Sequence, residues 1–219
     1  MKKLLILLFS NLILLFSNAQ SHNQGAFSFT LGYDAGIHGV TYTSEYNSTI
    51  VDQDTSGSAT RMAHLTASYN IFKFMSIGLD LRSGSYLEDP ENATANGNKV
   101  SMSALNLRFY PVNKDKFAWY IGPTFGFSRL EINRIYTFIV SIPAQYRFKS
   151  GHFGLETGFN WYFVKNFGMN FALGYSSQNF NMYYYRLNGE EQDLSNYENT
   201  LKTAGVHMNI GLSYHFGGR

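Results

Sequence analysis

Four charged side chains stand out because they fall in segments where charge is otherwise rare. Asp80 and Arg82 are two positions apart, so a β-strand would place both on the same face. Arg108 and Glu156 each lie among large apolar neighbours in two further segments. A buried charge without a partner is costly, so charges at such positions must pair. The sequence therefore predicts an interior polar network in which Arg82 and Arg108 bridge Asp80 and Glu156, with Asp34 as a further inward acid.

Several histidine and serine side chains are expected to face the same interior as these charged groups. A histidine, a serine and a carboxylate together can form a catalytic triad for nucleophilic hydrolysis. His64 and His207 fall on the inward face, as do Ser68 and Ser76. No Gly-x-Ser-x-Gly or comparable spacing surrounds either serine. We therefore predict no catalytic residue and interpret these groups as hydrogen-bonding interior filler. A lipid-modifying enzyme is the alternative.

A calcium-loop pattern begins at Asp52. The segment Asp52 to Gly57 has oxygen ligands at its first, third and fifth positions and glycine at its sixth. The twelfth position, which holds a bidentate glutamate in such loops, is Ala63. We interpret the acids as part of a polar loop, with weak divalent-ion binding as the alternative. No metal or cofactor-binding residue is predicted.

The stretch from Phe159 to Tyr175 indicates which elements position these groups. Large apolar side chains recur at every second residue, and glycine, asparagine or alanine mostly fill the places between them. Successive side chains of a strand point to opposite faces, so one face is oily and uncharged while the other is small and polar. This pattern, with a turn at residues 164–166, is typical of a transmembrane β-barrel whose oily face meets lipid. A similar hairpin surrounds Phe72.

The same alternation predicts eight strands, each near the roughly 9–11 residues that a tilted membrane strand needs. They span residues 26–36, 60–70, 74–83, 100–110, 117–128, 152–163, 167–177 and 203–216. Pro123 falls inside the fifth strand, although proline cannot donate a ladder hydrogen bond. The predicted fold class is an all-β, antiparallel, eight-stranded transmembrane up-and-down β-barrel.

Long and short connections alternate between these strands. The long ones, at residues 37–59, 84–99, 129–151 and 178–202, carry most of the acidic residues, while the short turns are mostly basic. Long external loops and short periplasmic turns are the usual asymmetry of such barrels. The apolar residues 135–148 are interpreted as part of the third loop, extending the sheet beyond the membrane. Counting 135–148 and 180–187 as extra strands gives the alternative of ten.

Residues 1–19 are typical of an export signal. Lys2 and Lys3 precede the apolar run from Leu4 to Phe16, and cleavage is expected near Ala19. Residues 20–219 would then form one barrel domain. Charged residues make up 15% of the chain, against about 25% in soluble domains, and aromatic residues make up 17%. The chain has no cysteine, which excludes thiol catalysis, disulfides and a lipoprotein anchor, and its near-neutral charge does not indicate nucleic-acid binding.

A family resemblance rests on three features: the alternating strands, the aromatic–lysine–asparagine turn from Phe163 to Phe167, and the ending Gly211 to Phe216. These resemble the small outer-membrane β-barrel proteins common in Bacteroidetes, which are similar to the OmpA, OmpX and opacity class of porin-family barrels. The resemblance covers nearly all of the mature chain. Three residues follow Phe216, so the chain departs from a strictly terminal aromatic residue. The family brings no catalytic residue to carry over.

The resemblance implies a place in the cell outer membrane, in contact with outer-membrane lipid and lipopolysaccharide. It also implies insertion by the barrel-assembly machinery. The expected function is non-enzymatic: the barrel anchors external loops that serve envelope integrity or surface interaction. The alternatives are the lipid-modifying enzyme and a narrow channel.

Overall fold

The structure is a computed structural model that describes residues 22–88, 98–137, 141–164 and 166–217. The predicted export signal at residues 1–19 and its cleavage site lie outside the described residues. The strands are β1 (Ala26–Tyr46), β2 (Thr49–Phe72), β3 (Met75–Leu87), β4 (Asn98–Lys114), β5 (Phe117–Thr137), β6 (Ser141–Val164), β7 (Phe167–Leu187), β8 (Glu190–Glu191) and β9 (Tyr197–Gly217). Across the described ranges, no helix is long and apolar enough to cross a membrane.

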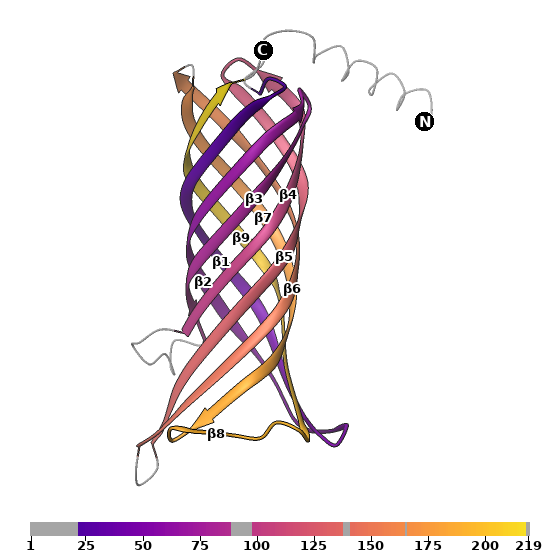
Figure 1. Ribbon diagram of the computed structural model, residues 1–219, viewed down its shortest axis with the longest axis vertical. Helices are drawn as coiled ribbons and strands as arrows, with labels where there is room; N and C mark the ends of the chain where they lie inside the picture. The colour runs from indigo at the N-terminus through magenta and orange to yellow at the C-terminus, as the bar shows by residue number, and fades with distance from the viewer. Residues whose placement is uncertain (1–21, 89–97, 138–140, 165, 218–219) are drawn as a thin grey trace, which may run out of the picture.

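The long strands close into a ring (Figure 1). Strands β1 to β7 pair antiparallel in sequence order, and β9 pairs with both β7 and β1. The two residues of β8 only extend the edge of β7. The fold is therefore the predicted eight-stranded, antiparallel, up-and-down barrel of the transmembrane type. The ten-strand alternative is wrong, because the described part of residues 135–148 belongs to β5 and β6, and residues 180–187 belong to β7.

The strands are much longer than predicted. β2 has 24 residues, about twice the length that a membrane crossing needs. The predicted loop at residues 37–59 is wrong: β1 and β2 stay paired up to Tyr46 and Thr49, and only Asn47 and Ser48 form the turn. Both turn residues have positive φ, 48° and 63°, as a type I′ hairpin turn requires. Asn47 therefore lies in a tight turn of a continuous hairpin.

Two other predicted loops are also largely strand. β5 and β6 stay paired as far as Thr137 and Ser141, within the predicted loop at residues 129–151. Residues 178–202 are divided among the end of β7, β8 and the start of β9. Of the predicted loop at residues 84–99, residues 84–87 belong to β3 and residues 98–99 to β4, while residues 89–97 lie outside the described residues.

The reason for these errors is an inversion of the hydrophobic pattern within single strands. In β5, Phe125 and Phe127 face outward and Thr124 faces inward, whereas farther along Leu130 is buried inside and Arg129 is exposed. Side chains keep alternating between the two faces, but the apolar residues change face. An outward apolar face fits lipid, and an inward one fits a barrel wall surrounded by water.

This inversion divides the barrel into two parts. The turn half contains both chain ends of the ring, Ala26 and Gly217, and the β2–β3, β4–β5 and β6–β7 turns; it is the upper half in Figure 1. The hairpin half carries the β1–β2, β5–β6 and β7–β8 hairpins at the lower end. Its interior is a cluster of buried apolar side chains: Val40, Met62, Tyr86, Val100, Leu130, Ile132, Phe148, Phe180 and Leu201.

Two of the three hairpins of the turn half share one construction. Pairing shifts between Asn70 and Phe72 in the β2–β3 hairpin, and between Tyr162 and Val164 in the β6–β7 hairpin. Each shift lies just before the turn, which supports the similarity seen in the sequence. Pro123 sits where β4–β5 pairing is interrupted, between the pairs Asn106–Thr124 and Phe109–Ile121. Because β4 and β5 are not paired at this position, no hydrogen bond from a backbone N–H of Pro123 is required there.

Candidate functional site

Arg82 is the centre of a charged layer in the middle of the lumen. Its Nη1 lies 2.7 Å from Asp34 Oδ2, and its Nη2 lies 2.7 Å from Asp80 Oδ2 and 3.1 Å from Glu156 Oε2. These acids come from β1, β3 and β6, and all four side chains are buried. Ring closure therefore brings residues from three separate strands onto one guanidinium group.

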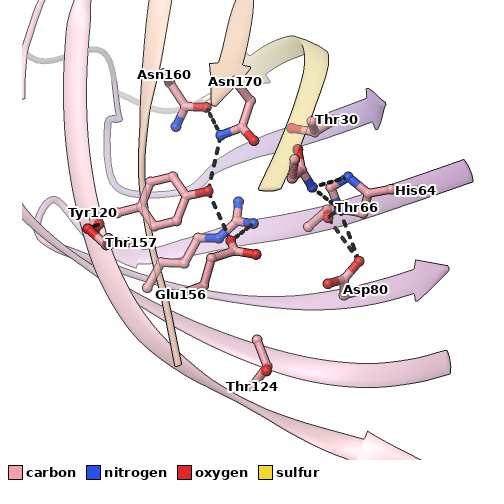
Figure 2. A network of polar contacts seen from close by, with 12 residues as sticks. Thr30, His64, Thr66, Asp80, Tyr120, Thr124, Glu156, Thr157, Asn160 and Asn170 are labelled. Atoms are coloured by element: carbon pink, nitrogen blue, oxygen red, sulfur yellow. Dashed lines mark hydrogen bonds and ion pairs between the residues drawn. The ribbon is translucent and has the colours of Figure 1, made fainter. Parts of the chain in front are cut away.

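Glu156 links this centre to a second arginine. Arg108 Nη2 lies 3.1 Å from Glu156 Oε1, and the Tyr120 hydroxyl donates a hydrogen bond of 3.0 Å to the same oxygen. The guanidinium carbon of Arg108 also lies 4.4 Å above the centre of the Tyr120 ring. Figure 2 shows Tyr120 pointing at Glu156 and continuing, through its hydroxyl, to Asn170 and Asn160.

The structure thus brings together all four residues named from the sequence: Asp80, Arg82, Arg108 and Glu156. Asp34 joins them directly, as a partner of Arg82. Sequence reasoning missed Tyr120 as a member of the layer, because an inward tyrosine also fits an apolar core. His207 also approaches, with Nε2 at 3.9 Å from Glu156 Oε2.

His64 tests the hydrolytic alternative. Its Nε2 lies 3.1 Å from Asp80 Oδ1 and 2.5 Å from Thr66 Oγ1, while its Nδ1 lies 2.6 Å from the side-chain nitrogen of Asn209 (Figure 2). In a catalytic triad the acid and the nucleophile bind opposite ring nitrogens of the histidine. Here the acid and the hydroxyl share one nitrogen. The group is therefore arranged as a buried hydrogen-bond cluster.

His22 closes the turn end of the lumen, a role that the sequence did not reveal. Its backbone N–H donates to Asn113 Oδ1 at 3.0 Å, and the Asn113 amide donates back to the His22 carbonyl at 2.9 Å. The ring stacks on Tyr110 at 4.3 Å and lies 3.2 Å from the Tyr162 hydroxyl and from the Asn160 amide nitrogen. A histidine just before the first strand carried no periodic signal, so only the fold could place it.

The lumen between the charged layer and the apolar cluster holds a small cavity of about 30 Å³. His38, His152 and His207 line it beside Arg82 and Asp34. His38 lies just past the predicted strand at residues 26–36, and His152 is the first residue of the predicted strand at 152–163, but the observed strands continue well past both. A cavity of this volume holds about two water molecules. The arrangement gives a lumen with little internal space, in which several buried polar atoms, among them Asn106 Nδ2 and Asn170 Oδ1, have no hydrogen-bond partner within the described part of the chain.

The acidic segment at Asp52 is not a loop. Asp52 and Asp54 lie on β2, paired with Ser44 and Tyr42 of β1. An extended strand separates alternate residues by roughly 6–7 Å, so it does not wrap oxygen ligands around one ion as a calcium loop does. Among the described residues, no group of three or more His, Asp or Glu side chains is placed to hold a metal ion.

Comparisons with known proteins agree with this architecture. No protein-family model matches the chain, and no curated protein is similar to it in sequence. Among solved structures, the chain is similar to the outer membrane protein OprG of Pseudomonas aeruginosa, with 15% identity over 92% of this chain and 100% of that one, at a TM-score of 0.61. It is also similar to the outer membrane protein AlkL, with 10% identity over 91% and 94% of the two chains, at a TM-score of 0.52. At these identities the likeness shows the fold alone.

Proposed function

We propose that the chain is an exported outer-membrane barrel of the small type common in Bacteroidetes, with a closed lumen and no enzymatic activity. The export signal at residues 1–19, with cleavage near Ala19, would leave residues 20–219 as the barrel. In this proposal the turn half lies in the membrane with its turns in the periplasm. The hairpin half projects from the cell and serves envelope integrity or surface interaction.

One observation carries the proposal: the outward face of the turn half is apolar and uncharged on every strand. Exposed residues of this face include Phe29, Leu31, Leu65, Leu79, Leu105, Phe125, Leu155, Leu173, Met208 and Ile210. A water-soluble protein rarely exposes so large a continuous apolar surface, whereas lipid requires one. The closed ring leaves no unpaired strand edge along this face, which a membrane also requires.

The filled lumen favours an anchor over a channel. Arg82 and its three carboxylate partners cross the middle of the barrel, the His22 group blocks one end, and the apolar cluster fills the other half. An eight-stranded barrel is just wide enough for side chains to fill. The lumen therefore offers no continuous water path.

Electrical recording of the purified barrel in planar phospholipid bilayers tests this proposal. Insertion is verified first, from the faster gel migration of the unheated, folded barrel. Inserted wild-type protein should show no steady conductance. A stable open channel would overturn the closed-lumen proposal, and failure to insert into bilayers would overturn the membrane assignment.

Location and orientation are tested in cells that have an outer membrane. The protein should fractionate with that membrane, and protease added to intact cells should cut near Glu190, between β7 and β9. Cleavage confined to the turns at Lys73 or Lys116 would reverse the orientation.

A further inference from the structure

Two cations lie side by side on the outer wall of the barrel, where the hydrophobic pattern inverts. Arg129 of β5 and Lys149 of β6 are direct cross-strand partners, and both are exposed. Within the described residues neither forms an ion pair with a carboxylate; Lys149 Nζ lies only above the Tyr183 ring, at 5.8 Å. Like charges directly opposite each other on a sheet are destabilising. The pair is therefore suited to an anion placed between the two side chains.

A shallow apolar groove begins directly beside this pair. The next outward pair toward the membrane is Phe127 with Gly151, and the one after it is Phe125 with Phe153. Phe127 is 77% exposed, more than any other large apolar side chain described. Gly151 leaves a gap, because a Cβ atom built there would meet nothing within 4 Å. The groove is lined by Leu105, Phe125, Phe127, Gly151, Phe153 and Ser177.

The acidic residue nearest to this pair along β5 already has a basic partner. Glu131, the next outward residue of β5, lies 3.3 Å from Arg147 of β6. Its other cross-strand partner is the exposed Lys99 of β4, so this row of the wall also carries more positive than negative charge. No described carboxylate in this row is therefore free to neutralise Arg129 and Lys149, which are the two cations next to the groove.

We propose that Arg129, Lys149 and the groove form a binding site for a phosphorylated, acylated lipid of the outer leaflet, of the lipopolysaccharide type. A phosphate bridges the two cations, with the Arg129 guanidinium able to donate two parallel hydrogen bonds to it. An acyl chain of the same molecule fills the gap over Gly151 between the phenylalanine rings. A lipid fits both the cation pair and the apolar groove, because its charged headgroup and its acyl chains meet at the membrane surface. At that level the outer wall of the barrel changes from apolar to polar. The proposal rests on the membrane placement proposed above, with the hairpin half outside.

Binding is measured with lipid A carrying both phosphates, titrated into the full-length mature barrel in phosphatidylcholine nanodiscs. The test variant is Arg129→Gln/Lys149→Gln. Its matched control is Lys114→Gln/Lys116→Gln, which removes two exposed bases at the turn end. The test variant should bind roughly tenfold more weakly or worse, since two basic groups at a membrane surface each contribute to anionic-lipid binding. The control should stay within about twofold of wild type on the same scale.

Two further arms separate the parts of the ligand. Dephosphorylated lipid A should bind wild type about as weakly as lipid A binds the test variant. Gly151→Trp fills the groove while keeping both cations, so it should also weaken binding of intact lipid A. Inorganic pyrophosphate at matched phosphate concentration should not displace the lipid.

Equal binding by wild type and the test variant, equal binding of the dephosphorylated lipid, an unaffected Gly151→Trp variant, or displacement by pyrophosphate would each overturn the site. Folding of every variant is verified by gel migration without heating. A barrel that inserts and stays non-conducting but shows no lipid preference refutes only this inference. A chain that does not insert refutes the proposed function instead.

Discussion

The turn half and the hairpin half of this barrel are built from the same strands, yet their interiors are opposite in kind. The turn half holds Arg82, Glu156 and their partners inside and presents phenylalanine and leucine outside. The hairpin half holds Leu130, Phe148 and other apolar groups inside and presents Arg129 and Lys149 outside. Because the strands continue through both halves, backbone geometry cannot be the cause. The difference matches the surroundings proposed for each half: lipid around the turn half and water around the hairpin half.

The two interiors are therefore expected to be stabilised by different interactions. In the turn half, stability depends on pairing of buried charges, each of which becomes costly when its partner is removed. In the hairpin half, it depends on burying apolar surface, as in a soluble protein. The following substitutions test this contrast through the free energy of unfolding, measured by urea titration of the barrel in phospholipid vesicles.

The largest effect is expected for Arg82→Met. This change leaves the carboxylates of Asp34, Asp80 and Glu156 in the lumen with Arg108 as the remaining arginine, and it should lower the free energy of unfolding by about 3–5 kcal/mol. Glu156→Ala, which strips a partner from both arginines, should fall in the same range of about 3–5 kcal/mol if water is kept out.

The matched control for the charged layer is Arg134→Met. Arg134 pairs with Glu88 at 2.8 Å, but its side chain is 49% exposed. Its loss should cost less than about 1 kcal/mol. If Arg82→Met cost no more than this control, the charged layer would not stabilise the turn half.

A somewhat smaller effect is expected on the lipid face. Leu173→Arg places a charge on the outward surface of β7 and should cost about 2–4 kcal/mol near the bilayer midplane. Thr55→Arg, on an exposed position of the hairpin half, should change stability by less than about 0.5 kcal/mol. Ala172→Ser, the inward neighbour of Leu173, should cost far less than Leu173→Arg. Equal costs for arginine at residues 173 and 55 would mean that the two halves share one environment.

Removing a single methylene group tests the apolar interior of the hairpin half. Ile132 is buried in the apolar cluster, whereas Ile135, on the same strand, is 56% exposed. Ile132→Val should cost about 0.5–1.5 kcal/mol, because it leaves a small cavity. Ile135→Val should stay within about 0.5 kcal/mol of wild type. A larger cost at Ile135 than at Ile132 would contradict the inward packing of this half.

The smallest effect concerns the turn that ends the hairpin half. Ser48 has a φ of 63°, a conformation that glycine adopts without steric cost. Ser48→Gly should therefore stabilise the barrel by up to about 1 kcal/mol, less the entropy that glycine loses on folding. Ser56→Gly, at an extended position of β2, should instead destabilise by about 0.5–1 kcal/mol. Destabilisation by Ser48→Gly equal to that of Ser56→Gly would argue against the type I′ turn.

Sequence reasoning was most successful where lipid sets the pattern. Uncharged outward faces such as that of β7 alternate strictly with small or polar inward residues, so strand count, fold class and the inward positions of Asp80, Arg82, Arg108 and Glu156 were all readable from spacing. It failed in the hairpin half, where outward residues such as Arg129 and Lys149 are polar. A polar strand in water and a polar loop have similar composition, so only the inversion of the alternation could have distinguished them.

The partners inside the barrel were decided by tertiary structure. Spacing indicates that Asp80 and Arg82 share a face, but Asp34 meets Arg82 only because the ring closes and curves β1, β3 and β6 around one narrow lumen. The same holds for His22, whose polar partners come from β2, β4 and β6. Alternation along a strand is a local property, fixed by backbone geometry and therefore legible in the sequence. Contact across the lumen depends on the curvature and register of all eight strands together, and no single segment of the chain contains that information.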